Sequence, residues 1–168
     1  MTIFALSHPL NPTPLPMATN QLPVHNIILA EDDEDDKYIF ADALREINPG
    51  IKVEYVSDGN QLMALLENFL PDLLFLDLDM PHKNGLQCLV EIRGNEKLEH
   101  LPTVVFSSTT RPANIQTAYE MGAHLFLIKS SNFNDYKAAL QSIMRLPWKT
   151  PEVIRKQYCI NGRYTAFS

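Results

Sequence analysis

Short apolar runs alternate along the chain with stretches whose apolar residues recur at helical spacing. A short apolar run is typical of a strand buried on both faces, and helical spacing is typical of a helix with one buried face. One further run alternates apolar and polar residues, which also predicts a strand. The expected strands are residues 27–30, 53–55, 73–76, 103–106 and 125–128.

A helix is expected after each of these strands. Asn48-Pro49-Gly50 and Pro71 end two of the helices, and Gly122 is the expected C-terminal stop of the fourth. Five successive strand–helix units predict an α/β fold, a three-layer sandwich with helices on both faces of a five-stranded parallel sheet. The apolar positions of the helices fall within residues 38–47, 62–69, 86–92, 115–121 and 133–144.

Polar residues follow four of the five expected strands at their carboxyl ends. In an open parallel sheet, ligands bind in the crevice outside these ends, so the polar side chains are expected to converge. Carboxylates bind Mg²⁺, a lysine holds a phosphate oxygen as a point charge, and a hydroxyl holds another. The polar residues are Glu31, Asp32, Asp77, Asp79, Ser107 and Lys129.

This set of side chains indicates a phosphoryl site, in which catalysis consists mainly of positioning and charge neutralisation. The chain has no glycine-rich loop of the kind that holds a nucleotide. The phosphoryl group is therefore expected to arrive on another carrier and to be transferred to a carboxylate of the chain.

Charge narrows the choice of partners. The 168 residues include 20 acidic and 14 basic ones, which gives a net charge of −6. That balance argues against a nucleic-acid partner and against an anionic membrane surface, because both need a basic face. No apolar run approaches the ~20 residues of a membrane helix. Cys88 and Cys159 lack the spacing of a zinc or redox motif and fit a cytoplasmic location.

The two ends of the chain differ from its middle in composition. Residues 1–25 contain no Asp, Glu, Lys or Arg and hold five of the twelve prolines, which predicts a flexible tail. Residues 26–146 have 19 acidic and 10 basic residues, a net charge of −9, and hold all five strand–helix units. Residues 147–168 carry +3 and form an extension too short for a DNA-binding domain. Trp148 and Tyr158 are expected to dock on the body or to mediate association.

Four sequence motifs, each at the end of a strand, resemble the receiver domain of two-component response regulators over roughly residues 26–146. The resemblance implies a flavodoxin-like sheet in the order 2-1-3-4-5, in a stand-alone receiver that signals by protein contact. The motifs are Ile27-Ile28-Leu29-Ala30-Glu31-Asp32, Leu74-Phe75-Leu76-Asp77-Leu78-Asp79-Met80-Pro81 with Asn84-Gly85, Pro102-Thr103-Val104-Val105-Phe106-Ser107-Ser108, and Gly122-Ala123 with Phe126-Leu127-Ile128-Lys129.

The resemblance also implies a metal site and a phosphoacceptor. Asp77 would accept a phosphoryl group from a phosphohistidine and would be one ligand of Mg²⁺. Asp32 would bind the metal directly, and Glu31 would bind it through water. The backbone carbonyl of Asp79 would complete the site.

Three further residues would respond to phosphorylation in a protein of this family. Ser107 would close onto the phosphoryl group, Lys129 would bind it, and Phe126 would turn inward as a switch. The change would remodel the face made by the fourth helix, the fifth strand and the fifth helix, through which two copies could pair. The implied partners are a sensor histidine kinase or a histidine phosphotransfer protein, and a downstream protein. The chain would catalyse only its own phosphorylation and dephosphorylation.

One competing class is a haloacid-dehalogenase-like phosphohydrolase. Asp77-Leu78-Asp79 after an apolar strand fits its nucleophile motif, with Asp77 as nucleophile and Asp79 as acid and base. That family normally carries the nucleophile near the N-terminus and the acidic pair after the lysine, and this chain has neither feature. The receiver is the favoured interpretation, although Lys129-Ser130 stands where receivers usually have Lys-Pro.

Other polar residues are assigned no part in the chemistry. Asp33, Glu34, Asp35 and Asp36 suit the first turn of a helix, where the helix dipole favours negative charge. Cys88 is expected to contribute to the packing of a helix and to have no chemical role. The histidines lack metal-ligand spacing and are expected to be solvated; they are His8, His25, His82, His100 and His124.

Overall fold

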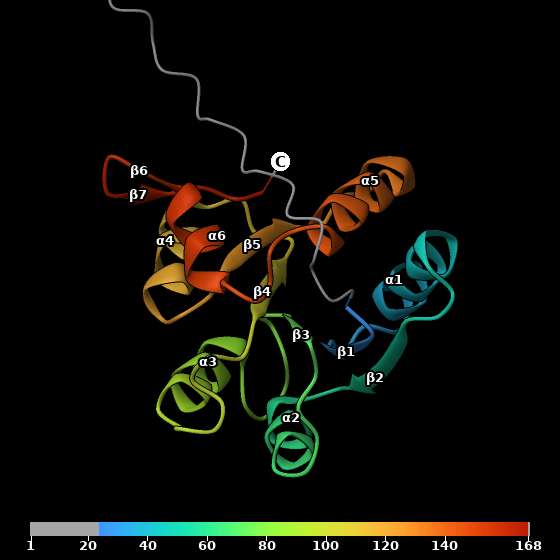
Figure 1. The fold of residues 1–168 in the computed structure, drawn as a ribbon, viewed down its shortest axis with the longest axis horizontal. Helices are drawn as coiled ribbons and strands as arrows, with labels where there is room; N and C mark the ends of the chain where they lie inside the picture. The colour runs from blue at the N-terminus through green and yellow to red at the C-terminus, as the bar shows by residue number, and fades with distance from the viewer. Residues whose placement is uncertain (1–23, 168) are drawn as a thin grey trace, which may run out of the picture.

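The computed structural model describes residues 24–167, and Figure 1 shows its course. The strands of the main sheet are β1 (Asn26–Ala30), β2 (Lys52–Val56), β3 (Leu73–Leu76), β4 (Thr103–Ser107) and β5 (Leu125–Ile128). The helices between and after them are α1 (Glu34–Ile47), α2 (Gly59–Leu66), α3 (Gly85–Arg93), α4 (Pro112–Glu120) and α5 (Phe133–Met144). All ten elements occur where the sequence predicts them. Most of the predicted N-terminal tail lies outside the described residues.

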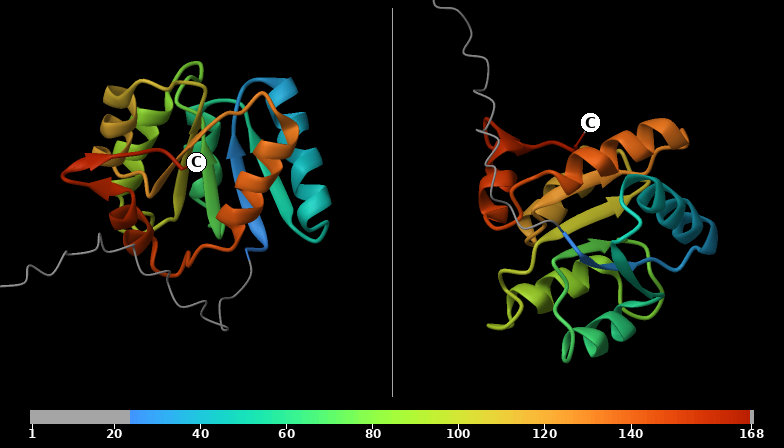
Figure 2. Two further views of the ribbon diagram at one scale, coloured as in Figure 1. Left: turned by 90° about the horizontal axis from the view of Figure 1, so that it is seen from above. Right: turned by 45° about the vertical axis from the view of Figure 1, so that its right-hand side comes forward.

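The five strands are parallel and stand in the order β2-β1-β3-β4-β5, which confirms the predicted topology. Helices α1 and α5 cover one face of the sheet, and α2, α3 and α4 cover the other (Figures 1 and 2). None of the helices in residues 24–167 is long and apolar enough to cross a membrane.

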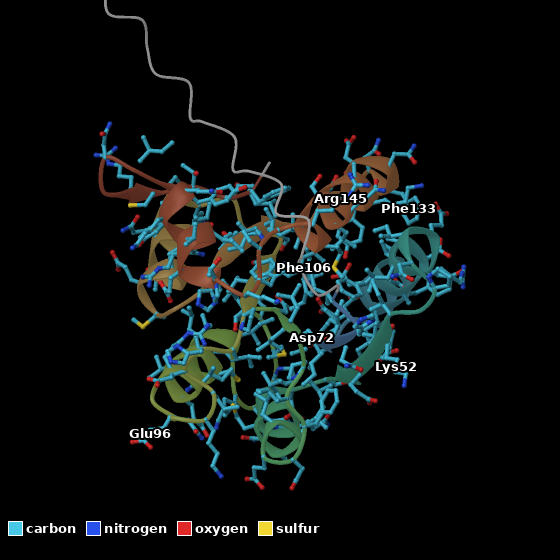
Figure 3. The ribbon with its side chains drawn as sticks, viewed as in Figure 1. Lys52, Asp72, Glu96, Phe106, Phe133 and Arg145 are labelled. Carbon is cyan, nitrogen blue, oxygen red and sulfur yellow. The ribbon has the colours of Figure 1, made fainter. Side chains whose placement is uncertain are left out.

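The apolar runs are explained by the burial of the sheet on both faces. In β1, Ile27 and Leu29 pack with α1 and α5, whereas Ile28 and Ala30 pack towards α2, α3 and α4. All four are fully buried. A parallel strand covered by helices on both sides needs apolar side chains at successive positions, and a run such as residues 27–30 supplies them. Phe106 on β4 lies in the interior in the same way, whereas Glu96 and Arg145 are exposed (Figure 3).

Four helices begin at a side chain that caps them. Each capping oxygen accepts a hydrogen bond from a backbone N–H of the first turn, which would otherwise lack a partner. The capping residues are Asp33 for α1, Asp58 for α2, Asn84 for α3 and Asn132 for α5. In α1, α2 and α5 the capping residue comes within four residues of the end of a strand, so it fixes where the chain turns at the carboxyl edge of the sheet.

The C-terminal residues add structure that the sequence pattern did not predict. They form helix α6 (Pro151–Gln157) and a hairpin of β6 (Cys159–Ile160) and β7 (Arg163–Tyr164). Trp148 is nearly buried, and its indole N–H donates to the carbonyl of Ile143 over 2.8 Å. The expectation that Trp148 docks on the body is therefore confirmed.

The expectation that all histidines are solvated is wrong for His124, which is fully buried just before β5. The Thr103 N–H and the Arg93 guanidinium both approach its Nδ1, at 3.1 and 3.2 Å. Both of these groups are donors, so Nδ1 accepts and the proton of the neutral ring lies on Nε2, 3.2 Å from Glu152 Oε1. Burial, together with Arg93, lowers the pKa of His124 to about 4. Sequence alone does not reveal that this loop histidine joins β5 to α6.

Because the pKa of His124 in the folded chain lies below its ordinary value of 6.5, acid should destabilise the fold. Between pH 6.5 and 4 the unfolded chain binds a proton at this residue and the folded chain does not. The free energy of unfolding should therefore fall as pH is lowered from 6.5 to 4. The slope from this residue is at most about 1.4 kcal/mol per pH unit. Urea unfolding at several pH values should show a flatter pH profile for His124→Gln. The matched control is His100→Gln at a highly exposed histidine; equal slopes in both variants would contradict the prediction.

Candidate functional site

The sheet brings the predicted site residues to one edge. Ala30 of β1 pairs with Leu76 of β3, so Glu31 and Asp77, the residues that follow, emerge side by side. Hydrogen bonds continue the ladder beyond the strands: the Asp77 N–H donates to the Ala30 carbonyl over 2.9 Å. On the other side, the Lys129 N–H donates to the Ser107 carbonyl over 2.8 Å.

Three carboxylates form the centre of the site. One oxygen each of Glu31, Asp32 and Asp77 can be chosen so that all three lie within 4.8 Å of one another. Glu31 and Asp77 are buried, and Asp32 is exposed at the mouth. A set of hard oxygen ligands with one open side suits Mg²⁺ or Mn²⁺, which keep water or substrate oxygen among their ligands. The donor set therefore fits the divalent metal that the sequence predicts.

Lys129 is the cation that faces these carboxylates. Its Nζ donates to Glu31 Oε2 at 2.5 Å and to Asp36 Oδ2 at 2.7 Å, and it lies 3.7 Å from Asp77 Oδ2. It also lies 4.8 Å from the centre of the Phe106 ring. Burial alone would lower the pKa of Lys129, but the hydrogen bonds to Asp36 and Glu31 outweigh it and raise the pKa. The ammonium therefore stays charged.

Asp77 is held in conditions that oppose its negative charge. Burial and the neighbouring Glu31 carboxylate raise its pKa to about 7, although Lys129 and the backbone N–H of Asp79 act in the opposite direction. The Asp79 N–H donates to Asp77 Oδ1 at 3.3 Å. A carboxylate in such a place is expected to gain strongly from a nearby cation.

The loop after Asp77 returns tightly to the start of α3. The Gly85 N–H donates to the Leu78 carbonyl over 3.1 Å. A Cβ at position 85 would lie 2.2 Å from the Asp77 carbonyl oxygen, so only glycine permits this approach. Asn84 and Gln87 form a capping box at the same helix start. The Asn84-Gly85 pair thus sets the backbone that carries Asp77.

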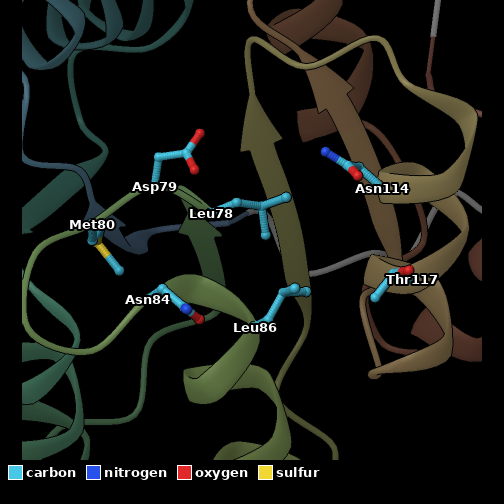
Figure 4. A pocket seen from close by; sticks show the side chains of 7 residues that line it. All are labelled: Leu78, Asp79, Met80, Asn84, Leu86, Asn114 and Thr117. Atoms are coloured by element: carbon cyan, nitrogen blue, oxygen red, sulfur yellow. The ribbon is translucent and has the colours of Figure 1, made fainter.

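A pocket of about 460 Å³ opens beside this loop, between it and α4 (Figure 4). Asp79 and Met80 line it from the loop, and Asn114 and Thr117 line it from α4. Asp79 is exposed, unlike Asp77. The pocket therefore lies between the loop after Asp77 and α4 on this side.

The two predicted switch residues lie near the site without a direct contact to Asp77 among the described interactions. Ser107 is buried at the end of β4, and its Oγ accepts a hydrogen bond from the Thr109 N–H at 3.3 Å. Ser108 is exposed, so the hydroxyl at the strand end is that of Ser107. Phe126 is fully buried and packs with the residues of α2, α3 and α4.

Asp36 is a site residue that the sequence analysis missed. It was assigned only to the first turn of α1, yet its carboxylate is one of the two that bind the Lys129 ammonium. Asp33 indeed caps the helix, and Asp35 makes no ion pair or side-chain hydrogen bond within residues 24–167. Position along the chain was the only available signal: Asp36 lies in the first turn of α1, the helix that begins directly after the Glu31-Asp32 pair.

Comparison with known proteins agrees with the geometry. The family model of the response regulator receiver domain matches residues 27–141. Response regulator Rcp1 of Synechocystis is 28% identical over 134 residues, covering 76% of this chain and 91% of Rcp1. A crystal structure of Rcp1 with Mn²⁺ has a TM-score of 0.65 at 28% identity and covers 71% of this chain and 91% of that one.

A second solved structure is the phosphorylated cyanobacterial phytochrome response regulator RcpA. It has a TM-score of 0.69 at 28% identity and covers 76% of this chain and 96% of that one. Of the two classes that the Asp77-Leu78-Asp79 motif left open, the comparisons support the receiver. The sheet order, the acidic cluster beside Lys129 and the match over residues 27–141 lead to one conclusion: this chain belongs to the response regulator receiver family.

Proposed function

We propose that this receiver accepts a phosphoryl group on Asp77 from a phosphohistidine of a sensor histidine kinase or a histidine phosphotransfer protein. The observation that carries the proposal is the position of Asp77. It is a buried carboxylate at the end of the central strand β3, next to Glu31 and 3.7 Å from the Lys129 ammonium. A carboxylate so placed is costly to the fold unless it serves a cation or a reacting group.

In the proposed reaction, an oxygen of Asp77 attacks the phosphorus. The P–N bond to the donor histidine breaks, its electron pair returns to the imidazole, and an acyl phosphate forms on Asp77. Water later hydrolyses this acyl phosphate, so the chain catalyses only its own phosphorylation and dephosphorylation. The attack needs the carboxylate form of Asp77, which a neighbouring cation favours because burial otherwise raises the pKa of Asp77.

We propose Mg²⁺ as the cofactor, held by Glu31, Asp32, Asp77 and the backbone carbonyl of Asp79. When bound, it would neutralise the crowded carboxylates and the charge of the phosphoryl oxygens. Two facts support this site: the three carboxylates lie within reach of a single ion, and the relative Rcp1 has a Mn²⁺-bound form.

Lys129 and Ser107 would hold the transferred group. Lys129 would exchange Asp36 or Glu31 for a phosphoryl oxygen, a short movement since Asp77 Oδ2 already lies 3.7 Å away. Ser107 would give up the Thr109 N–H and bind another oxygen, which would pull on the loop before α4. Phe126 would respond as the switch residue on the neighbouring strand.

We propose a division into a tail of residues 1–25, a receiver of residues 26–146 and an extension of residues 147–168, which the family match over 27–141 supports. The output would be a protein contact, to a downstream protein or to a second copy through the α4–β5–α5 face. A cytoplasmic location suits the two free cysteines, Cys88 and Cys159.

Phosphorylation should depend on Asp77. With Mg²⁺ and acetyl phosphate, intact mass spectrometry should show one phosphoryl adduct on the wild type and none on Asp77→Asn. Asp79→Asn is the matched control, because it keeps the backbone carbonyl and should keep the adduct. An equal adduct on wild type and Asp77→Asn would refute the assignment.

Metal binding should depend on Asp32, the exposed member of the acidic cluster. Asp32→Asn removes one charged ligand and should weaken Mg²⁺ binding about tenfold, which is about 1.4 kcal/mol. Isothermal titration calorimetry would measure this. Asp35→Asn removes the same charge from a residue in the first turn of α1 that is not a member of the acidic cluster, and it should change the affinity little. Equal losses in both variants would show that only net charge matters.

Asp36 should influence Asp77 through Lys129. Asp36→Asn removes a negative charge and one partner of the ammonium, so the positive charge of Lys129 acts more fully on Asp77. The pKa of Asp77 should then fall from about 7 by about half a pH unit, as followed by carboxyl ¹³C NMR in metal-free buffer. The control Asp35→Asn should leave it nearly unchanged. A pKa that rises in Asp36→Asn would contradict the pairing seen here.

A further inference from the structure

The outer edge of β5 is covered by the chain's own C-terminus. We call residues 158–167 the cap; it consists of the β6–β7 hairpin and the residues up to Phe167. Leu127 and Phe167 form a parallel β-bridge, so the cap ends as an extra edge on the main sheet. Figures 1 and 2 show the cap alongside α4 and β5. Tyr164 and Ala166 pack against one face of the body, and Tyr158 contacts the cores on both sides of the sheet.

The backbone of Phe126 is the point of attachment. An edge strand leaves outward N–H and C=O groups that need partners when they are covered. The Phe126 carbonyl accepts the Phe167 N–H at 2.7 Å. The Phe126 N–H donates to the Tyr119 hydroxyl at 3.1 Å, and that hydroxyl donates to the Thr165 carbonyl at 3.0 Å.

This arrangement replaces one step of a β-ladder with a side chain. In a plain parallel ladder, the Phe126 N–H would bond directly to the Thr165 carbonyl, because a residue pairs with the two neighbours of its partner. Here the Tyr119 hydroxyl from α4 stands between them and serves both. The contact between β5 and the cap therefore depends on the position of α4.

Other contacts hold Tyr119 in this place. Its ring stacks on Tyr164, with the ring centres 4.5 Å apart and the planes 9° from parallel. Its backbone carbonyl accepts a hydrogen bond from Arg155 at 2.7 Å, and Gln116, one turn earlier on α4, accepts the Tyr164 N–H at 2.9 Å. Tyr119 is fully buried, and burial raises the pKa of its hydroxyl, so it remains a donor.

The same elements lead back to the phosphoryl site. β5 carries Phe126 at the cap, and Lys129 of the site follows the end of the same strand, three residues after Phe126. Helix α4 carries Tyr119 and begins after the loop in which the Thr109 N–H bonds Ser107 Oγ. Ser107 and Lys129 are thus each connected through one of these elements to the Tyr119 hydroxyl bridge, Lys129 through β5 and Ser107 through the loop before α4.

We propose that the cap covers the α4–β5 surface of its own chain, that the hydrogen bonds of the Tyr119 hydroxyl hold it there, and that phosphorylation of Asp77 loosens it. The inference rests on the proposed function, since phosphorylation of Asp77 is its trigger. The occupant is the chain's own segment because Thr165 and Phe167 already pair with the Tyr119 hydroxyl and the Phe126 carbonyl. Its charge is compatible with that place: the cap carries +1 from Arg163, whereas residues 26–146 carry −9. A partner that uses this surface, a second copy included, must first displace the cap.

Hydrogen–deuterium exchange of the full chain with Mg²⁺ tests the proposal, with intact mass recorded on the same samples. Acetyl phosphate should speed exchange of the cap and of the Phe126 amide about tenfold, with little change in α1. Asp77→Asn should show no such effect. An adduct on Asp77 with an unchanged cap would overturn the proposal and leave the proposed function standing. Absence of any adduct would overturn both.

A pair of tyrosine variants tests the role of the Tyr119 hydroxyl without phosphorylation. Tyr119→Phe keeps the stacked ring but removes the bridging hydroxyl, so exchange of the cap should rise while α1 stays protected. Tyr164→Phe is the matched control: its ring belongs to the same stack, and its hydroxyl forms no hydrogen bond within residues 24–167. Equal behaviour of the two variants would refute the role of Tyr119. If Tyr119→Phe also exposes α1, it has unfolded, and the wild-type comparison decides.

Discussion

A buried excess of negative charge beside one lysine is the constraint on which this receiver depends. Glu31 and Asp77 are both buried at the carboxyl edge of the sheet, and in the part of the chain that the structure describes, Lys129 is the one basic residue that forms an ion pair with them. The two carboxylates repel each other strongly where water is excluded, so the site favours the binding of a cation. Part of the acidity of residues 26–146 therefore lies where it can serve the chemistry of the site.

The parallel sheet makes this crowding possible. β1 and β3 are neighbours, so the residues after them emerge together, and the crossover helices start with caps that hold the chain close to the edge. Gly85 lets the loop after Asp77 fold back without a clash. A different constraint acts at the outer edge of β5. There the backbone N–H and C=O groups of Phe126 point away from the sheet and need hydrogen-bond partners. The C-terminal residues and Tyr119 supply those partners, which links the edge of the sheet to the site.

Much of the molecule could be predicted because strands buried on both faces leave a strong pattern. The apolar runs, the polar residues that end them and the alternation with helices all follow from local chemistry, and Glu31, Asp32, Asp77 and Lys129 do converge. The surroundings of His124 and Asp36 were predicted wrongly, and for one common reason. A polar residue in a loop or a first helical turn is usually solvated, and nothing local reveals that Arg93 or Lys129 lies beside it.

The sequence by itself determined the alternation of parallel strands with helices and the set of side chains at one edge, since both depend on periodicity. The order of the strands followed from the resemblance to receiver domains. The tertiary structure alone decided which acid binds Lys129, how the pKa of Asp77 is shifted, and where residues 147–167 lie. Those features rest on distances between residues far apart in the chain, such as Asp36 and Lys129 or Tyr119 and Thr165. Short polar and aromatic segments have no periodicity of their own, so only packing against the finished sheet gives them a place.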